Sequence, residues 1–193
     1  MAILKIARMG HPILRQVAEP VAEPSAPDVA ALVRDMLETM VDARGIGLAA
    51  PQVHVAKRVV VFQVPRARAG DEGGVAVPLT VLINPTIEPL DEETADGWEA
   101  CLSVPGLTGL VARHRRIRYV GVDLRGERIE RTAEGFHARV VQHECDHLDG
   151  VLYPQRMTDL RRLAFVEELR HGATAPVSEI SQQRQDSASA EAT

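Results

Sequence analysis

The chain has 193 residues, of which 45% are hydrophobic and 25% are charged. This size and composition suit one ordinary globular domain with a full hydrophobic core, and they exclude a disulfide-stapled miniprotein and a mostly disordered chain. Its 22 Lys and Arg residues against 27 Asp and Glu residues give a net charge of −5, which argues against a protein whose whole surface is committed to DNA or RNA.

The chain contains two cysteines and seven histidines. So few cysteines do not suggest a disulfide framework, and metal ligation or catalysis becomes the more interesting use of a thiol. At the N-terminus, Lys5, Arg8 and Pro12 interrupt any apolar run before it reaches the length of a signal-peptide core. Nothing elsewhere approaches the roughly 20 apolar residues that span a bilayer. We therefore expect a protein of a reducing compartment, most simply the cytoplasm, with no membrane partner.

The first predicted element is a helix that follows a Pro-rich segment. Ser25 is expected to be its N-cap, with Pro27 and Asp28 in the first turn. Apolar residues repeat at helical spacing over residues 29–40, and Gly45 is expected to end the helix.

Strands are predicted in the middle of the chain. Residues 58–64 and 79–84 are rich in β-branched side chains and too short for typical helices, and the Gly- and charge-rich stretch 66–74 is expected to be an exposed loop between them. Residues 116–131 alternate on either side of a turn around Arg125-Gly126, which predicts a hairpin.

A second helix is predicted over residues 133–148, with Gly150 placed to end it. A short helix is expected over residues 158–171. Residues 172–193 are small and polar and are expected to form a disordered tail, which leaves one domain over residues 1–171. Because the order of helix, several strands and helix lacks β-α-β alternation, the fold class is α+β, with mainly antiparallel sheets packed around the second helix.

The second helix carries a candidate metal site. Residues 143–147 read HECDH, and on a helix His143 and His147 project from one face one turn apart, close enough to bind the same cation. Glu144 lies about 100° around the helix from His143, where its carboxylate can handle the protons of a water molecule without being a ligand. The alternative is that both histidines simply pack or lie on a wet helix face.

A catalytic metal needs a third protein ligand. The extended zinc-protease pattern fails, because its last histidine position holds Tyr153. Cys101 in EACLS (99–103) is the remaining candidate, since a thiolate beside two imidazoles leaves one position open for water. A lone cysteine is otherwise more often a buried small hydrophobe. Cys145 points about 200° away from His143 on the helix and is expected to be packed.

Two further segments have ambiguous patterns. GIGLAAPQ (45–52) contains G-x-G-x-x-A, but a helix precedes it and Pro51 directly follows, which defeats a dinucleotide-binding turn. Its glycines suggest close approach of another chain, and Gln52 offers an amide donor, although an ordinary helix-ending loop is the alternative. The densest basic run, residues 113–118, is expected to be a solvated strand and turn or a contact for RNA or an acidic partner.

Taken together, GIGLAAPQ (45–52), EACLS (99–103) and QHECDH (142–147) resemble the three ordered signature motifs of the peptide deformylases. The resemblance spans residues 3–165, and three motifs in the correct order are far more specific than H-E-x-x-H alone. The stretch QHECDHLDG, together with VPG at residues 104–106, is similar to the organellar and related bacterial branch of that family.

The resemblance implies hydrolysis of the formyl group from N-formylmethionine at the start of nascent polypeptides, with release of formate. The metal ligands implied by motif match are Cys101, His143 and His147. Glu144 would be the general acid and base. Gln52 and the backbone N–H of Leu102 would stabilise the oxyanion, and Gly47 would hydrogen-bond the substrate backbone.

The implied cofactor is one divalent metal ion, natively Fe²⁺, with Zn²⁺, Ni²⁺ or Co²⁺ often found in purified protein. The implied partners are N-formylmethionyl nascent peptides, and a transient ribosome contact stays open. Ala100 departs from the family, which usually has glycine between the glutamate and the cysteine. If that position needs a positive φ, alanine would cost about 1 kcal/mol and shift Cys101.

Two other functions compete with this interpretation. A metallopeptidase that cleaves internal peptide bonds must explain Tyr153 at the missing histidine position and the otherwise unused segments 45–52 and 99–103. A non-catalytic deformylase-like peptide binder has only Ala100 as sequence support. Formate release from a short formyl-Met peptide discriminates among the three.

Overall fold

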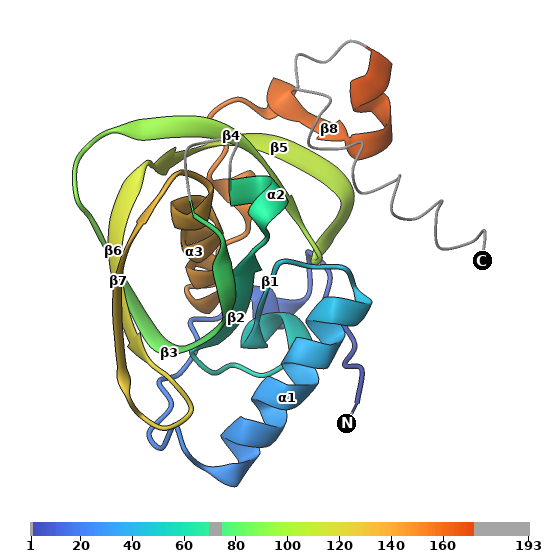
Figure 1. The fold of residues 1–193 in the computed structure, drawn as a ribbon. Helices are drawn as coiled ribbons and strands as arrows, with labels where there is room; N and C mark the ends of the chain where they lie inside the picture. Colours follow the sequence, from blue (N-terminus) through green and yellow to red (C-terminus); the bar gives the residue numbers. More distant parts are fainter. Residues whose placement is uncertain (1, 70–74, 172–193) are drawn as a thin grey trace, which may run out of the picture.

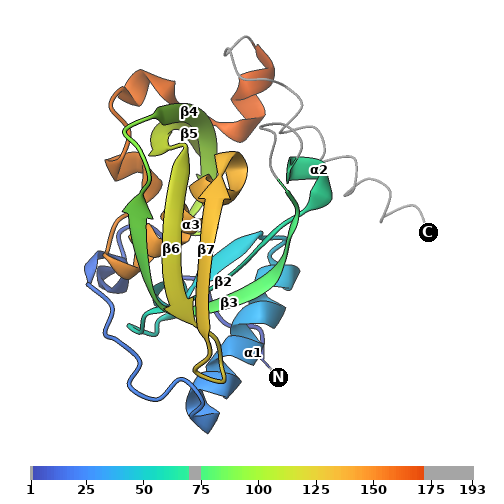
Figure 2. The ribbon, with the colours of Figure 1, turned by 60° about the vertical axis from the view of Figure 1, so that its left-hand side comes forward.

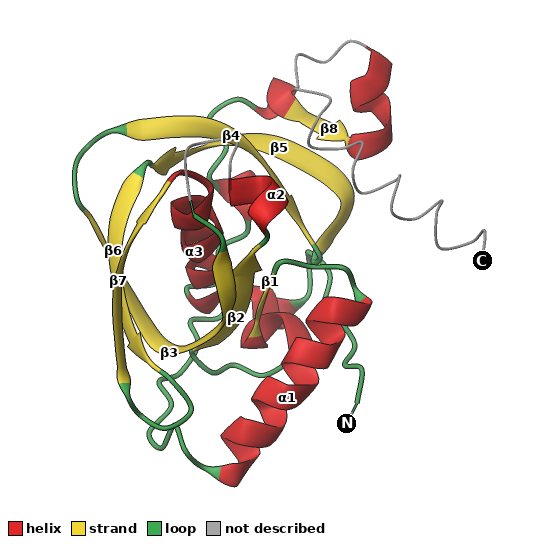
Figure 3. Cartoon of the chain, viewed as in Figure 1, coloured by secondary structure: helices red, strands yellow, loops and turns green. Residues whose placement is uncertain are grey.

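Strand β2 (Val59–Val64) is buried on both of its faces. Successive side chains of a strand point to opposite faces. Val59 and Val61 pack in one apolar cluster with α1 (Pro27–Asp42). Val60, Phe62 and Val64 pack in another apolar cluster with α3 (Gly135–Leu148). This strand, which is apolar except for Gln63, therefore holds one helix on each side of the sheet, as Figures 1 and 3 show.

The structure is a computed structural model that describes residues 2–69 and 75–171. Its strands form two antiparallel sheets, with the orders β1-β2-β3-β6-β7 and β4-β5-β8. The other strands are β1 (Gly47–Ala49), β3 (Val77–Pro89), β4 (Thr94–Cys101), β5 (Val104–His114), β6 (Arg116–Val122), β7 (Arg128–Glu134) and β8 (Leu163–Phe165). The shorter helical segments are α2 (Arg66–Ala69) and the 3-10 helices η1 (Pro12–Arg15), η2 (Ala50–Val53), η3 (Tyr153–Gln155), η4 (Leu160–Arg162) and η5 (Val166–His171).

Helix α3 lies between the two sheets, with β6 and β7 in front of it in Figure 2. Ala138, Val141 and Cys145 anchor it in the apolar cluster of the larger sheet. Beyond the end of the helix, Gly150 has a φ of 72°. A Cβ at Gly150 would lie 2.7 Å from the carbonyl carbon of Arg15, so only glycine fits where the chain turns away.

Most of the predicted elements are confirmed, some with different limits. The predicted strand 58–64 is β2, and residues 79–84 belong to the longer β3. The hairpin over 116–131 forms as β6 and β7, and the second helix is α3. The α+β class with antiparallel sheets is confirmed.

Pro27 and Asp28 lie in the first turn of α1 as predicted, but the predicted caps at the two ends of this helix are wrong. Ala26 occupies the N-cap position, where no side chain caps the helix, because the Ser25 hydroxyl donates to the carboxylate of Glu23 instead. The helix ends at Asp42, and Arg44 rather than Gly45 takes the positive φ that follows it.

The single helix expected over residues 158–171 forms only as two short 3-10 helices, η4 and η5, with β8 between them. Residues 163–165 pair with residues 107–109 and add β8 to the smaller sheet, so inter-strand hydrogen bonds replace helical ones there. The expected loop 66–74 begins instead with the helical turn α2, and its residues 70–74 lie outside the described part. The predicted tail, 172–193, also lies outside the described residues. No described helix is long and apolar enough to cross a bilayer.

Candidate metal centre

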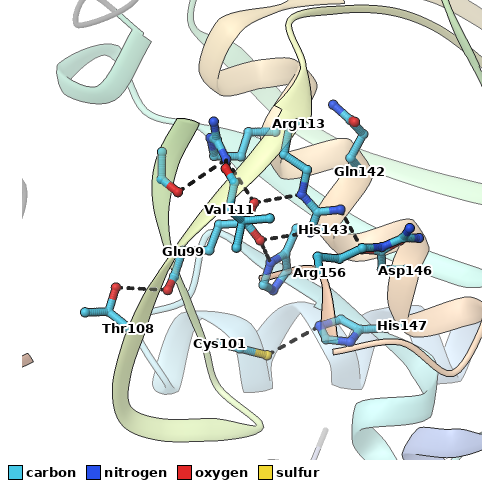
Figure 4. Close-up of polar contacts among 12 residues, drawn as sticks. Glu99, Cys101, Thr108, Val111, Arg113, Gln142, His143, Asp146, His147 and Arg156 are labelled. Atoms are coloured by element: carbon cyan, nitrogen blue, oxygen red, sulfur yellow. Dashed lines mark hydrogen bonds and ion pairs between the residues drawn. The ribbon is translucent and has the colours of Figure 1, made fainter. Parts of the chain in front are cut away.

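Three side chains with metal-binding atoms converge between β4 and α3. Cys101 is the last residue of β4, and His143 and His147 lie one turn apart on α3. Their donor atoms all lie within 4.8 Å of one another, and Cys101 Sγ is 3.4 Å from His147 Nε2 (Figure 4). All three residues are buried. The structure thus brings together the three residues that the motifs marked as ligands.

The electrostatics of this cluster suit a divalent cation. Burial alone would raise the pKa of the Cys101 thiol, but His147 and His143 outweigh burial and hold this pKa well below its usual value. The thiolate, which is the form that binds metals, is therefore favoured. One thiolate and two imidazoles form a donor set that fits Fe²⁺ or Zn²⁺ and leaves a coordination position open.

Glu99 fixes the orientation of His143. A carboxylate oxygen of Glu99 lies 2.8 Å from His143 Nδ1, which leaves Nε2 as the free ring nitrogen. Glu99 lies two residues before Cys101, and both are buried on the same face of β4. Burial would raise the pKa of Glu99, but hydrogen bonds from Arg113 and His143 outweigh it and hold this pKa well below its usual value. The carboxylate therefore stays ionised beside the imidazole.

Two buried arginines neutralise Glu99. Arg113 donates from Nε and Nη2 to its two oxygens at 2.8 and 2.9 Å, and Arg139 donates from Nη1 at 3.1 Å. Arg113 Nη1 also donates to Asp146 at 2.6 Å, and Arg156 binds Asp146 in turn at 2.7 Å (Figure 4). His143 is therefore hydrogen-bonded to a network in which acidic and basic side chains alternate. Each buried charge in this network has a partner of opposite sign, as a buried charge requires.

Glu144 lies beside the cluster with one oxygen atom free. The residue is buried, and its Oε2 has no hydrogen-bond partner among the described residues. Burial raises the pKa of Glu144 to about 7, against the opposing effect of His143 and His147. Gly47 makes room for the carboxylate, because a Cβ there would lie 2.1 Å from Glu144 Oε1. A carboxyl group with a pKa near neutrality at such a site suits proton transfer.

Gln52 connects η2 with the segment that follows β4. Its Oε1 accepts from the N–H of Ala49 at 2.8 Å, and its Nε2 lies 3.1 Å from Ser103 Oγ and 3.5 Å from Cys101 Sγ. The amide nitrogen is therefore held beside the sulfur atom, where it can donate to an oxygen bound at the cluster. Leu102, between Cys101 and Ser103, is half-buried.

Known proteins match this chain over most of its length. A family model described as polypeptide deformylase matches residues 3–163. The chain belongs to the polypeptide deformylase family. A relative from Bordetella pertussis, named peptide deformylase 1, is 56% identical over 164 residues, which are 85% of this chain and 93% of that protein.

Solved deformylase structures share this fold. The class I type b enzyme of Acinetobacter baumannii bound to Met-Ala-Ser is 37% identical, with a TM-score of 0.75 over 81% of this chain and 99% of that one. The deformylase of Thermotoga maritima is 36% identical, with a TM-score of 0.73 over 82% of this chain and 100% of that one.

Ala100 adds no backbone strain to this deformylase. Among the described residues other than glycine, φ is positive only at Arg44, His54 and Asn84. Ala100 lies next to a register shift in β4, and its side chain is exposed. The cost expected for a positive φ at Ala100 is therefore absent.

Cys145 and Tyr153 both pack away from solvent in this deformylase. Cys145 is buried in the apolar cluster that anchors α3, as predicted, and burial raises its pKa. Tyr153, at the position of the missing third histidine, is buried with its ring stacked 6.3 Å from the ring of His143. Tyr153 therefore packs against the ring of His143, a candidate metal ligand.

The basic run 113–118 of this deformylase is largely neutralised. The expectation that it is solvated is wrong for Arg113, which is only 6% exposed and binds Glu99. The exposed arginines of the run pair with acidic residues of β3 or of the loop that follows it: Arg115 with Glu93, Arg116 with Asp91 and Arg118 with Glu88.

No role was predicted for Glu99 or Arg139, and Arg113 was predicted only as part of the basic run. Glu99 could have been found from the period of two that places it on the same face as Cys101. Arg139 lies one helical turn before His143, which places it on the same side of α3. The partners of Arg113 lie 14 and 33 residues away in the chain, so no local pattern could reveal them.

Proposed function

We propose that this deformylase hydrolyses the N-formyl group of N-formylmethionyl nascent peptides and releases formate, with the residues assigned by the three motifs. The observation that carries the proposal is the buried cluster of Cys101, His143 and His147 with the free oxygen of Glu144 beside it. The Acinetobacter baumannii relative bound to Met-Ala-Ser supports a substrate that begins with methionine.

Cys101, His143 and His147 would hold one divalent metal ion. When bound, the metal supplies Lewis-acid chemistry, because it acidifies water and polarises a carbonyl group. We take Fe²⁺ as the native ion. Loss of activity in air that is absent after cobalt or nickel substitution supports iron, because an iron-thiolate site is sensitive to oxidation. Air-stable activity in the protein as isolated contradicts iron.

Glu144 is the proton carrier of the proposed reaction. Its free carboxylate oxygen takes a proton from the attacking water, whose oxygen forms a bond with the formyl carbon. The bond between that carbon and the methionine nitrogen then breaks, and Glu144 returns the proton to the departing amine. The hydroxyl proton that remains on the product acid passes to the free amine, so formate and a peptide with an ammonium N-terminus are the products, and no atom or charge is left over.

Two donors stabilise the negative charge that develops on the formyl oxygen. The Gln52 amide nitrogen is held beside Cys101 by its bond to Ser103, and the backbone N–H of Leu102 follows Cys101 directly. Loss of one such donor typically costs about 3 kcal/mol of barrier. Gly47 would hydrogen-bond the peptide backbone.

The two sheets present edge strands near this site. β1 is the terminal strand of the larger sheet and β4 that of the smaller one. A terminal strand has backbone groups available to an extended peptide, which can bind by adding a strand. The substrate would therefore lie extended along Gly47 with its formyl group at the cluster.

The setting of this activity is also proposed. Residues 1–171 would form one catalytic domain in the cytoplasm, where nascent chains emerge. A transient contact with the ribosome is part of the proposal, although ion pairs already engage the exposed arginines of the basic run.

Incubation of the metal-loaded protein with formyl-Met-Ala-Ser tests the function. We expect formate and Met-Ala-Ser in equal amounts, measured by a formate dehydrogenase assay and mass spectrometry. Cleavage between Met and Ala would favour an internal peptidase, and no turnover by fully loaded protein would leave a peptide-binding role.

A further inference from the structure

A hollow of about 800 Å³ lies beside the segment that follows Cys101. None of the described residues that line it is acidic. Its polar lining consists of Lys5, Arg8, His11 and His54, and Leu102 and Pro105 also line it. We call this feature the basic hollow. It is a concave surface of one charge sign, and no step of the proposed reaction uses its charged side chains.

The basic hollow is built on the same segments as the metal centre. The N–H of Ala7 donates to the carbonyl of Gln52 at 2.7 Å, and the N–H of Met9 donates to the carbonyl of Ser103 at 2.7 Å. The rings of His11 and His54 pack edge to face at 4.8 Å. The N-terminal segment that carries the hollow's lysine and arginine is therefore tied to both motif segments, and its position relative to the cluster is fixed.

The two cations of the hollow are uncompensated. Lys5 and Arg8 are exposed, and neither forms an ion pair with any residue in the described part of the chain. The exposed arginines of the run 113–118 are instead paired. In a chain of net charge −5, two unpaired cations at one concave site create a local positive potential that attracts a carboxylate.

Leu102 connects the hollow with the path of the peptide. It follows Cys101 directly, and its Cδ1 atom would lie 2.9 Å from a Cβ at Gly45. Gly45 precedes the edge strand β1 by two residues. A peptide with its formyl group at the cluster that extends along β1 toward Gly45 would pass Leu102 and reach the hollow. Each extended residue covers about 3.3–3.6 Å, so only the first few residues after methionine come into range.

We propose that the basic hollow is a substrate subsite that binds an aspartate or glutamate side chain in the first few residues after N-formylmethionine. This inference rests on the proposed function, because it needs a formylated peptide at the cluster. Lys5 and Arg8 supply the charge that recognises the carboxylate, which makes them determinants of specificity and not of the chemical step.

The test compares formyl-Met pentapeptides that carry a single Asp, or the matching Asn, at each position from 2 to 5. Wild-type enzyme is compared with the double variant Lys5→Gln/Arg8→Gln. The control is Lys57→Gln/Arg125→Gln, which removes two cations that do not line the hollow. At low salt we expect the kcat/KM of the Asp peptide, divided by that of the matching Asn peptide, to be highest at one position. The difference should lie in KM and not in kcat. That ratio should fall by roughly two- to fivefold for each cation removed.

The control should keep the wild-type ratio, and 0.5 M KCl should abolish the difference between wild type and double variant. Equal kcat/KM of both enzymes for the Asn peptides shows that the double variant is folded. An Asp/Asn ratio that is the same in wild type and double variant at every position overturns the proposal. The proposal is also overturned if the Asp/Asn ratio is unchanged while the double variant co-sediments less with ribosomes than the wild type does. That result would assign the two cations to binding of RNA phosphate. No formate from any peptide would instead contradict the proposed function itself.

Discussion

Replacement of Gly47 by alanine tests the placement of Glu144 most sharply. The new Cβ would lie 2.1 Å from Oε1 and 2.5 Å from Cδ of Glu144, so the carboxyl group must move by roughly 1 Å to reach ordinary contact distance. A misplacement of that size can slow an enzyme about 100-fold, which corresponds to roughly 2.7 kcal/mol of barrier. We expect this loss in kcat. Metal content and Tm should change little, since Gly47 has no positive φ and the displaced atoms end a flexible side chain.

A double-mutant cycle separates this effect from a general disturbance of β1. In the Glu144→Asp background the shorter side chain leaves space for the new methyl group, so Gly47→Ala should cost far less there than in the wild type. Initial rates of formate release, with metal content measured for each variant, give the four values. An equal cost of Gly47→Ala in both backgrounds, or full activity of the single variant, refutes the assigned contact.

Three further results are expected. Glu99→Gln removes the buried counter-charge of Arg113 and Arg139, so the free energy of unfolding should fall by about 3–5 kcal/mol and the metal affinity by roughly 10–100-fold. Urea titration measures the first effect and chelator competition the second. An unchanged metal affinity contradicts the role of Glu99. Removal of the metal removes the link between β4 and α3. Because a ligand at 100 times its Kd stabilises a protein by about 2.7 kcal/mol, a chelator should lower Tm by several degrees. An unaffected Tm counts against the metal site. Burial, with the charge of Arg131, lowers the pKa of His137 from 6.5 to about 4. The unfolded chain therefore takes up this proton first, and stability is full above pH 6.5 and falls as the pH drops toward 4. His137→Gln should flatten that fall by on the order of 1 kcal/mol, whereas an identical fall in urea titrations of both proteins argues against it.

Local patterns were sufficient for the core of the site. His143 and His147 share a face because four residues make about one helical turn, and Cys101 was found from a motif and from the need for a third ligand. The run 58–64 predicted a strand from its composition alone, and the structure shows why residues 59–62 are all apolar, since helices cover both faces of the strand.

Interactions between distant segments could not be predicted in this way. Arg113 appeared in the sequence as one of several solvated cations, but it is buried because Glu99 and Asp146 come to it from another strand and from α3. Ser25 satisfied the rule for an N-cap, but Glu23 engages its hydroxyl. Residues 158–171 suggested a helix, but the free edge of β5 recruits three of them as β8. In each case a tertiary partner outweighed the local preference.

Formate release by the Glu144→Gln variant, measured with its metal content, tests whether Glu144 carries the proton in a metal-dependent hydrolysis. The substitution keeps the size of the side chain and removes its ability to accept a proton as a carboxylate. We expect wild-type metal occupancy, because Cys101, His143 and His147 are untouched, together with loss of formate release from formyl-Met-Ala-Ser. Turnover near the wild-type rate by the metal-loaded variant would contradict this role of Glu144.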